Sequence, residues 1–293
     1  MKLSDLLAVV EPVSFSGDEG TEITSVAYDS RKVLQGSLFV CIKGEETDGH
    51  KYIPNAIQAG AVAIVAQEAP SFPIDAALIL VQDARSALAR ISAAWFGYPA
   101  SRMTMIGLTG TKGKTTTSHM IKKILEKAGH KVGMIGTMGA FIGEEKVPVK
   151  NTTPESFELH ALFDRMVEKG CEYVVMEVSS QGLKHRRTEG ILFDYGAFLN
   201  ICPDHIGKGE HGDFEEYLSC KKLLFSQTKC TVVNVDDSRW REVTEKADHF
   251  VTVSTLGEAD FMGRDIQNIW EPGLLGVTFR ICGRMEGDMV LNM

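Results

Sequence analysis

A glycine-rich segment near the middle of the chain holds residue types that bind phosphate. Residues 107–115 spell Gly-Leu-Thr-Gly-Thr-Lys-Gly-Lys-Thr and lie between an apolar stretch and a segment with helical spacing. Small residues let backbone N–H groups approach phosphate oxygens, a lysine places positive charge beside terminal phosphates, and a threonine hydroxyl can bind Mg²⁺. The strict G-x-x-x-x-G-K-[ST] pattern fails because its first glycine falls on Leu108.

An ordinary glycine turn is the alternative for this segment. Gly-Lys-Thr at the start of a helix, after an apolar strand, instead favours a nucleotide site. The candidate nucleotide-binding residues are Gly110, Thr111, Lys112, Gly113, Lys114, Thr115 and Thr116.

Two polar side chains follow apolar stretches, at points where parallel strands would end. Glu177 follows residues 173–176, and His205 lies in the turn after residues 196–201. Open α/β sheets bind ligands at their carboxyl edge, so both residues are expected beside the phosphate-binding segment. A carboxylate there would be a hard oxygen ligand for Mg²⁺. A solvated strand-end glutamate and a surface histidine are the alternatives.

Lys221 lies on the apolar stripe of a predicted helix. At 100° per residue Phe214, Leu218 and Phe225 share its face, whereas Lys222 falls at the edge of the stripe. Desolvation lowers the pKa of a lysine and exposes its neutral amine, which is the form that can add CO₂. A lysine whose stem covers apolar surface while its charge reaches water is the alternative.

Alternating strands and helices are predicted to position these groups. From residue 102 the patterns predict strands at 103–108, 131–135, 172–178, 196–201, 231–235 and 250–254, and helices at 115–128, 155–168, 214–225 and 239–247. This alternation predicts an α/β fold with a doubly wound, mostly parallel sheet. After residue 260 strand-like segments between glycines predict a β-rich extension.

The first hundred residues predict a smaller α/β domain. Strands are expected at 38–42, 61–66 and 77–81, with helices at 52–59 and 83–96. Gly97 and Pro99 end the last helix. We therefore expect one domain at 1–100 and a second at 101–293.

Composition and charge exclude several classes of protein. Apolar residues make up 44% of the 293 residues and charged residues 24%, which is typical of a folded globular chain rather than a disordered one. A net charge of −8 lacks the basic field of a nucleic-acid binder. No apolar run approaches the ~18 residues that cross a bilayer, and the six cysteines form no C-x-x-C pair. We expect a cytoplasmic protein that binds neither membrane nor nucleic acid.

The glycine spacing G-x-x-G-T-x-G-K-T resembles the ATP loop of the Mur ligase family, which includes folylpolyglutamate synthetase. Other segments are similar to family members that add the third peptide residue to UDP-MurNAc-dipeptide, and they extend over nearly the whole chain. The similar segments are 28–31, 48–53, 151–154, 177–183, 200–205 and 210–217, followed by Lys221.

The resemblance implies an N-terminal UDP-sugar-binding domain and a central P-loop ATPase-like domain. It implies an ATP-dependent amide ligase that forms an acyl phosphate on UDP-MurNAc-L-Ala-D-Glu, joins an amino acid to it and serves peptidoglycan precursor synthesis. The cofactors implied are ATP and Mg²⁺.

The resemblance also implies roles for single residues. The expected catalytic residues are Lys114, Glu177, His205 and Lys221. The expected metal ligands are Thr115, Glu177, His205 and Lys221 as a CO₂-derived carbamate. The expected substrate-binding residues are Ser30 for the uridine nucleotide, with Asn151, Thr152, Thr153, Ser179 and Arg187. Because the run 184–187 departs from the family spelling, Arg186 is the alternative to Arg187.

Two other functions would use the same features. One is a non-catalytic protein that binds nucleotide or UDP-sugar, and the other is a small-molecule kinase. No segment before Met293 resembles the family's C-terminal domain, which receives the incoming amino acid. We therefore expect an incomplete central domain, no ligase domain, and a monomer that is inactive in ligation by itself.

Overall fold

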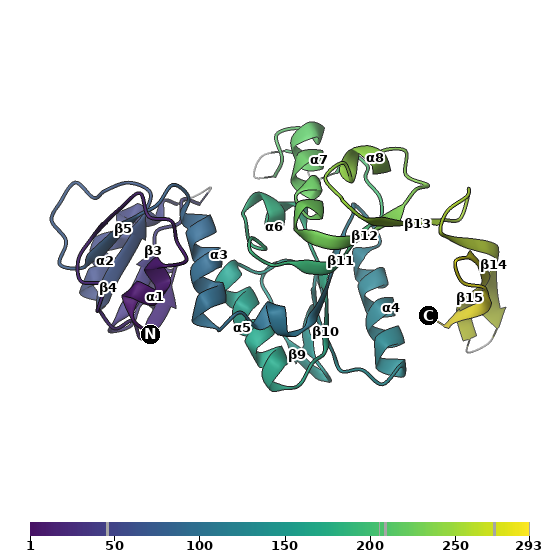
Figure 1. The fold of residues 1–293 in the computed structure, drawn as a ribbon, viewed down its shortest axis with the longest axis horizontal. Helices are drawn as coiled ribbons and strands as arrows, with labels where there is room; N and C mark the ends of the chain where they lie inside the picture. The colour runs from purple at the N-terminus through teal and green to yellow at the C-terminus, as the bar shows by residue number, and fades with distance from the viewer. Residues whose placement is uncertain (45–46, 205, 208–209, 272–273, 293) are drawn as a thin grey trace. The chain divides into compact units, whose positions relative to one another are not determined.

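The structure is a computed structural model that describes residues 1–44, 47–204, 206–207, 210–271 and 274–292 (Figure 1). Its chain forms two compact units. The first comprises Met1–Met103, Thr153–Gly170 and Lys184–Ile191, and the second comprises Thr104–Thr152, Cys171–Leu183 and Leu192–Met293. Each unit therefore combines segments that are distant in the sequence. The division into domains at residue 100 stays a prediction.

In the described residues the first unit has a five-stranded sheet in the order β1-β5-β4-β3-β2. Its strands are β1 (Ser14–Ser16), β2 (Ser25–Ala27), β3 (Ser37–Val40), β4 (Ala61–Ala66) and β5 (Ala77–Leu80). All neighbours pair in parallel except β1 and β5. Its helices are α1 (Leu3–Leu7), α2 (Ile53–Gln58), α3 (Ala84–Trp95) and α5 (Ser156–Glu168), with 3₁₀ turns at Ser30–Lys32, Gly49–Tyr52 and Pro99–Arg102.

Helix α3 illustrates how the sequence specifies this unit. The side chain of Asp83 accepts hydrogen bonds from the backbone N–H groups of Arg85 and Ser86 and thereby caps the helix. Its apolar residues at helical spacing are buried in the core with β3, β4 and β5, and they are Ala84, Ala87, Leu88 and Ile91. The helix begins and ends within two residues of the predicted bounds.

The second unit has an eleven-stranded sheet among the described residues, in the order β16-β15-β14-β13-β12-β11-β6-β10-β7-β8-β9. The strands are β6 (Thr104–Thr109), β7 (Val132–Gly136), β8 (Gly139–Ile142), β9 (Glu145–Val147), β10 (Tyr173–Glu177), β11 (Phe193–Phe198), β12 (Thr228–Asn234), β13 (Phe250–Ser254), β14 (Phe261–Glu271), β15 (Leu274–Gly283) and β16 (Gly287–Asn292). The strands from β7 to β14 in this order pair in parallel, and antiparallel strands flank them on both sides. The predicted mostly parallel α/β fold is confirmed.

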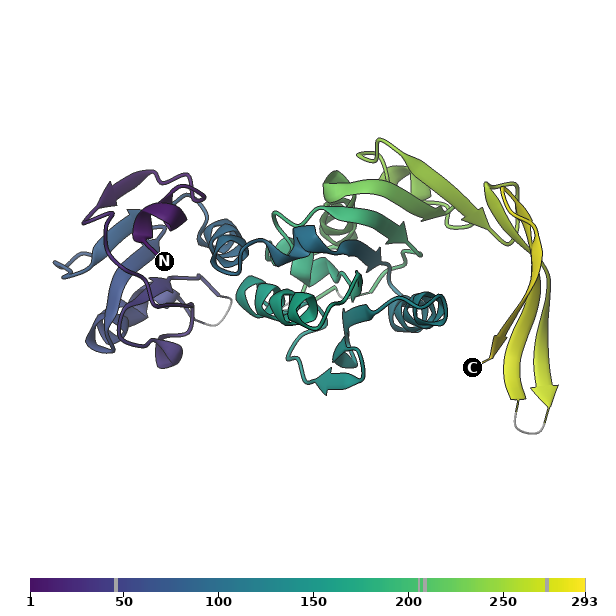
Figure 2. The ribbon, with the colours of Figure 1, turned by 60° about the horizontal axis from the view of Figure 1, so that its bottom comes forward.

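Helices cover both faces of this sheet (Figure 2). On one face Leu108 of β6 packs in a cluster with residues of α4 (Lys114–Lys127). On the other face a Cβ at the preceding residue, Gly107, would lie 2.8 Å from Phe193 and 3.3 Å from Leu224, just after α7 (Phe214–Lys222). Because successive strand residues face opposite sides, these contacts establish the doubly wound layering. The remaining helices are α6 (Ser180–Lys184) and α8 (Trp240–Val243).

Several elements differ from the predicted ones. The helix predicted at 214–225 ends at Lys222. The β8–β9 hairpin was not expected, because β9 is short and mostly exposed and so carries no apolar alternation. Strand β11 begins at Phe193 rather than at residue 196; its second residue is Asp194, whose carboxylate accepts the N–H of Met105. Helix α8 is shorter than the predicted 239–247. No helix in the described ranges is both long and apolar enough to cross a bilayer.

His160 on α5 is buried, and its ring nitrogens form no hydrogen bond with the described residues. Its side chain is 2% exposed. Its ring meets Phe163 edge-on. Burial lowers the pKa of His160 to about 4, because the imidazolium cannot be solvated there.

This burial predicts a loss of stability in mild acid. Between pH 6.5, the ordinary histidine value, and about 4, the unfolded chain binds a proton that the folded chain excludes. The free energy of unfolding should therefore fall as pH drops through this window, by up to about 1.4 kcal/mol per pH unit from this residue. Urea unfolding of His160→Leu across pH 4–7 should show a shallower dependence than the parent chain. The exposed His249→Gln is the control, and equal slopes for the parent chain and His160→Leu would contradict the assignment.

Candidate active site

The predicted phosphate-binding segment forms the turn between β6 and α4. Gly113 lies directly before the helix with φ of +86°, a conformation that L side chains rarely adopt. A Cβ on Gly110 would lie 3.0 Å from the Cβ of Leu199, so this position has little room for a side chain. The first N–H groups of α4 lack intrahelical partners and point toward this turn, which makes it suited to an anion.

Asn200, after β11, holds the loop in shape. Its Oδ1 accepts the N–H of Lys112 at 2.9 Å, and its Nδ2 donates to the carbonyl of Lys112 at 3.0 Å. Its own carbonyl accepts the N–H of Thr111 at 3.0 Å. Asn200 was not among the predicted site residues. Its position directly after an apolar strand, at the carboxyl edge, was the available signal.

Lys114 occupies the inside of the loop. Its Nζ donates to the carbonyls of Gly110 at 2.8 Å and Thr111 at 3.3 Å. Burial lowers the pKa of Lys114, and the nearby carboxylate of Glu177 opposes that shift. The residue thus brings a partly desolvated positive charge to the place where phosphates would bind. Of the other loop candidates, Thr116 is exposed in the first turn of α4.

Glu177 ends β10 beside the first turn of α4 and is 1% exposed. Its Oε2 accepts the hydroxyls of Thr115 at 3.1 Å and Thr137 at 3.2 Å, and its Oε1 accepts the N–H of Thr137 at 3.1 Å. A Cβ on Gly136 would lie 2.2 Å from Oε1, so this carboxylate requires glycine there. The sequence placed Thr115 and Glu177 correctly beside each other and missed Thr137.

The donor atoms at this place fit Mg²⁺. A threonine hydroxyl and a carboxylate are hard oxygen ligands, and Mg²⁺ in proteins commonly uses one or two such groups while retaining water. Over the described ranges no three His, Cys, Asp or Glu side chains cluster closely enough to hold a metal. Of the predicted ligands, Thr115 and Glu177 are brought together here. The predicted ligand His205 lies outside the described residues.

Lys221 is buried on α7, as the apolar stripe predicted, and is 1% exposed. Its Nζ donates to the carbonyl of Gly110 at 3.1 Å and lies 4.5 Å from the ring centroid of Tyr217. Burial and the charge of Lys114 lower the pKa of Lys221 to about 7. Its neighbour Lys222 instead forms ion pairs with two glutamates. Carbamylation of Lys221 stays a prediction.

Three of the expected substrate-binding residues lie in the second unit. Thr152 Oγ1 lies 3.1 Å from Thr137 Oγ1, which also donates to Glu177. Thr152 is therefore connected to Glu177 through Thr137. Ser179 Oγ accepts the N–H of Gly182 at the start of α6. Asn151 is half-buried.

Ser30 lines a cavity in the first unit. The cavity has a volume of about 420 Å³ and is also lined by Tyr28, Asp29, Arg31 and Tyr52. The guanidinium of Arg31 donates twice to Asp29 through Nε at 2.9 Å and Nη2 at 2.7 Å. Aromatic side chains beside hydroxyl and charged groups are suited to a polar heterocycle.

The two candidate arginines have different partners in the first unit. Arg187 donates to Glu155 at 2.7 Å and to the carbonyl of Thr153 at 3.1 Å. Arg186 has φ of +55° and pairs with Asp83 at 2.7 Å and with Glu189 at 2.9 Å. Which of them contacts substrate stays a prediction.

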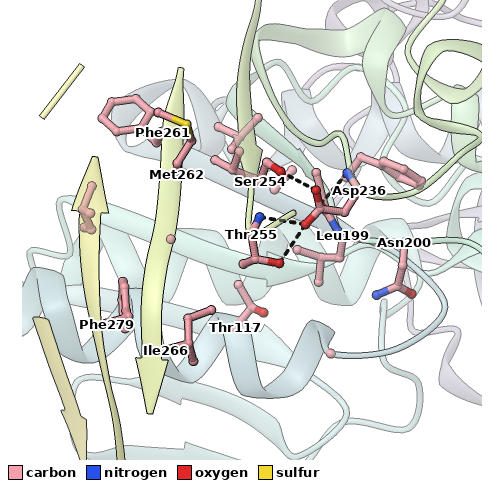
Figure 3. A pocket seen from close by; sticks show the side chains of 18 of the residues that line it. Thr117, Leu199, Asn200, Asp236, Ser254, Thr255, Phe261, Met262, Ile266 and Phe279 are labelled. Carbon is pink, nitrogen blue, oxygen red and sulfur yellow. Dashed lines mark hydrogen bonds between the residues drawn. The ribbon is translucent and has the colours of Figure 1, made fainter. Parts of the chain in front are cut away.

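A cavity of about 680 Å³ adjoins the phosphate loop in the second unit (Figure 3). From the loop and its surroundings, Lys112, Gly113, Thr117 and Asn200 line it. The apolar lining comes mainly from β14 and β15 and includes Phe261, Met262, Ile266 and Phe279.

The polar wall of this cavity is organised by Asp236, which the sequence analysis did not single out. Its carboxylate accepts the hydroxyl of Ser254 and both the N–H and the hydroxyl of Thr255 (Figure 3). Asp236 follows the partly buried strand β12, which was the only local signal of its position.

Comparisons with known proteins agree on one family. Residues 108–279 match the Mur ligase middle domain, and residues 22–96 match the Mur ligase family catalytic domain. The chain is 41% identical over 274 residues to a UDP-N-acetylmuramoyl-L-alanyl-D-glutamate–2,6-diaminopimelate ligase of Clostridium perfringens, covering 92% of this chain and 56% of that protein. The chain thus spans little more than half the length of this relative.

Solved structures share the fold. A structure of UDP-N-acetylmuramoyl-L-alanyl-D-glutamate–2,6-diaminopimelate ligase superposes with a TM-score of 0.83 at 21% identity, over 99% of this chain and 59% of that one. The MurF ligase of Thermotoga maritima in complex with ADP superposes with a TM-score of 0.59 at 20% identity, over 93% and 58%. Since the middle-domain match alone covers more than half of the chain, and the Clostridium relative extends the similarity over nearly all of it, this protein belongs to the Mur ligase family.

Proposed function

We propose that this chain provides the ATP-binding and UDP-sugar-binding parts of an amide ligase that adds the third amino acid to UDP-MurNAc-L-Ala-D-Glu. The observation that carries the proposal is the convergence of Lys114, Lys221 and Glu177 on one phosphate loop. The 41% identity to a ligase named for this substrate supports the choice of substrate. The first hundred residues would bind the UDP-sugar, and the remainder would bind ATP.

In the proposed reaction a carboxylate oxygen of the D-glutamyl residue attacks the γ-phosphorus of ATP and displaces ADP. The resulting acyl phosphate is attacked by an amine, which releases phosphate. The loop N–H groups and Lys114 would stabilise charge on the phosphate oxygens. To do so, the Lys114 ammonium exchanges the carbonyls of Gly110 and Thr111 for phosphate. A Mg²⁺ ion held by Thr115 and Glu177 would neutralise further phosphate charge.

The 680 Å³ cavity beside the loop is proposed to take the nucleoside of ATP. Gly113 and Thr117 are among its lining residues, its apolar lining suits the faces of a base, and Asn234 and Asp236 supply polar groups. The Thermotoga ligase of the same fold was solved with ADP, which supports a nucleotide in this fold.

We propose that Lys221 becomes a carbamate and helps bind Mg²⁺. With a pKa of about 7, about half of its amine is neutral at neutral pH, whereas an ordinary lysine amine is almost fully protonated. The neutral nitrogen attacks the carbon of CO₂ and loses a proton, which converts a buried cation into a carboxylate-like anion. From the resemblance, Ser30 is proposed to bind the uridine nucleotide, and Asn151, Thr152 and Thr153 the sugar-peptide end. Ser179 and Arg187, with Arg186 as the alternative to Arg187, are proposed as further substrate-binding residues. His205 is proposed as a further metal ligand.

Ligand binding and trapping of the intermediate test the function. The chain should bind both Mg·ATP and UDP-MurNAc-L-Ala-D-Glu in calorimetry. With both present, hydroxylamine should capture an acyl phosphate as a hydroxamate. Phosphorylated product that resists hydroxylamine would indicate a kinase, and binding without ADP formation would indicate a non-catalytic binder. No binding of either ligand would refute the proposal.

Lys114→Ala should weaken Mg·ATP binding by about 10- to 100-fold, since charge-assisted hydrogen bonds contribute about 1.5–3 kcal/mol. The fold should persist, because the side chain is only partly buried in a turn. Equilibrium dialysis measures the affinity, with Lys123→Ala on the exposed side of α4 as the control. Unchanged affinity in Lys114→Ala would remove this loop from the nucleotide site.

Gly136→Ala should disturb the proposed metal site without removing a ligand. The new methyl group must displace the Glu177 carboxylate, at a cost of about 1–3 kcal/mol of unfolding free energy. The Mg²⁺ concentration needed for half-maximal nucleotide binding should rise. Gly287→Ala is the control, because a Cβ there meets open space. If Gly136→Ala lowers the free energy of unfolding but leaves the Mg²⁺ dependence of nucleotide binding unchanged, Glu177 is not a ligand.

Lys221→Ala should abolish a carbamate signal that Lys222→Ala retains. The measurement is ¹³C NMR of the protein in ¹³C-bicarbonate with Mg²⁺ present. Both variants remove one lysine from α7, and only Lys221 contacts the phosphate loop. A parent chain without a lysine carbamate in saturating bicarbonate would leave Lys221 as a structural cation.

A further inference from the structure

Tyr217 joins three parts of the second unit through one side chain. It lies on α7 one turn before Lys221 and is fully buried, with 0% of its surface exposed. Its hydroxyl contacts the phosphate loop and its ring contacts Lys221 and His211. The proposed chemistry gives this residue no task, although it is the largest fully buried side chain in the described part of the protein.

The hydroxyl of Tyr217 contacts Thr111 within the loop. The two oxygens are 3.0 Å apart. Thr111 Oγ1 also accepts the N–H of Cys202 at 3.0 Å and lies 3.2 Å from the carbonyl of Cys202 as its donor. A threonine hydroxyl has one proton and two lone pairs, so this set is complete when Tyr217 donates. Thr111 is 5% exposed, and water cannot readily replace a lost partner.

The ring of Tyr217 lies beside Lys221. Lys221 Nζ lies over its face, and the ring of His211 packs against it with centroids 5.2 Å apart. His211 Nε2 in turn lies 2.9 Å from Ser180 Oγ, in the segment that follows Glu177. Tyr217 therefore links α7 directly to the loop, and through His211 to the start of α6.

We propose that Tyr217 is a positioning residue for nucleotide binding, which fixes the phosphate loop against α7 through the hydrogen bond from its hydroxyl to Thr111. Thr111 is next to Gly110, whose carbonyl accepts both Lys114 and Lys221. Holding Thr111 therefore sets where both ammonium groups meet the loop. This inference rests on the proposed function, because it assigns Tyr217 to the same ATP site.

Calorimetric titration of the chain with Mg·ATP tests the inference. Tyr217→Phe keeps the ring and removes only the hydroxyl, and it should weaken binding by about 3- to 10-fold, the range expected for one net hydrogen bond. Tyr195→Phe removes an exposed hydroxyl on β11 and should bind as the parent chain does. Unfolding midpoints are measured in parallel, so that loss of affinity is separated from loss of fold.

A double-mutant cycle distinguishes positioning from general destabilisation. Thr111→Val should weaken binding, Thr111→Ser should restore it, and Tyr217→Phe should add little to Thr111→Val because both remove the same bond. Because Thr111→Val also removes the two contacts of Thr111 with Cys202, the coupling between the two substitutions, rather than the single effect of Thr111→Val, reports on the bond to Tyr217. Parent-like affinity of Tyr217→Phe, or additive effects in the cycle, would overturn the inference alone. Absence of Mg·ATP binding by the parent chain would overturn the proposed function and this inference with it.

Discussion

The buried Lys221 and the half-buried Lys114 donate to a single backbone carbonyl, that of Gly110, and the rest of the site depends on this arrangement. Lys114 and Lys221 approach it at 2.8 and 3.1 Å, and neither forms an ion pair with a carboxylate of the described residues. The charge of Lys114 and burial both lower the pKa of Lys221. A site with two partly desolvated cations favours an anionic ligand, because a bound phosphate would supply the negative charge that no carboxylate of the described residues provides by ion pairing. Carbamylation of Lys221 would relieve the same excess.

Close packing near the phosphate loop restricts which side chains the neighbouring strands can carry. Parallel pairing of β10 with β6 sets Glu177 opposite Leu108, so the carboxylate reaches the first turn of α4. Gly136 on the adjacent β7 leaves space for that carboxylate. Asn200 and Tyr217 then hold the loop from β11 and α7, so that four elements fix the positions of a few polar atoms.

Patterns within short stretches predicted much of the fold. The bounds of β4 and β13 agree with the predicted strands, because β4 is an apolar run and β13 is rich in β-branched residues. The β8–β9 hairpin escaped prediction because its exposed strand gains stability from pairing rather than from burial. The composition of the first unit, which includes α5, also depends on contacts between segments distant in the chain.

The amino-acid sequence by itself determined the loop, the inward face of Lys221 and the strand-end position of Glu177. These features follow from local spacing: a glycine turn before a helix, an apolar stripe, and a run that ends at the edge of a sheet. Only the tertiary structure revealed Thr137, Asn200, Tyr217 and Asp236. Each is a single polar residue whose partner lies 15 or more residues away, so no local pattern encodes the contact. Strand order and helix packing decide which of these groups meet.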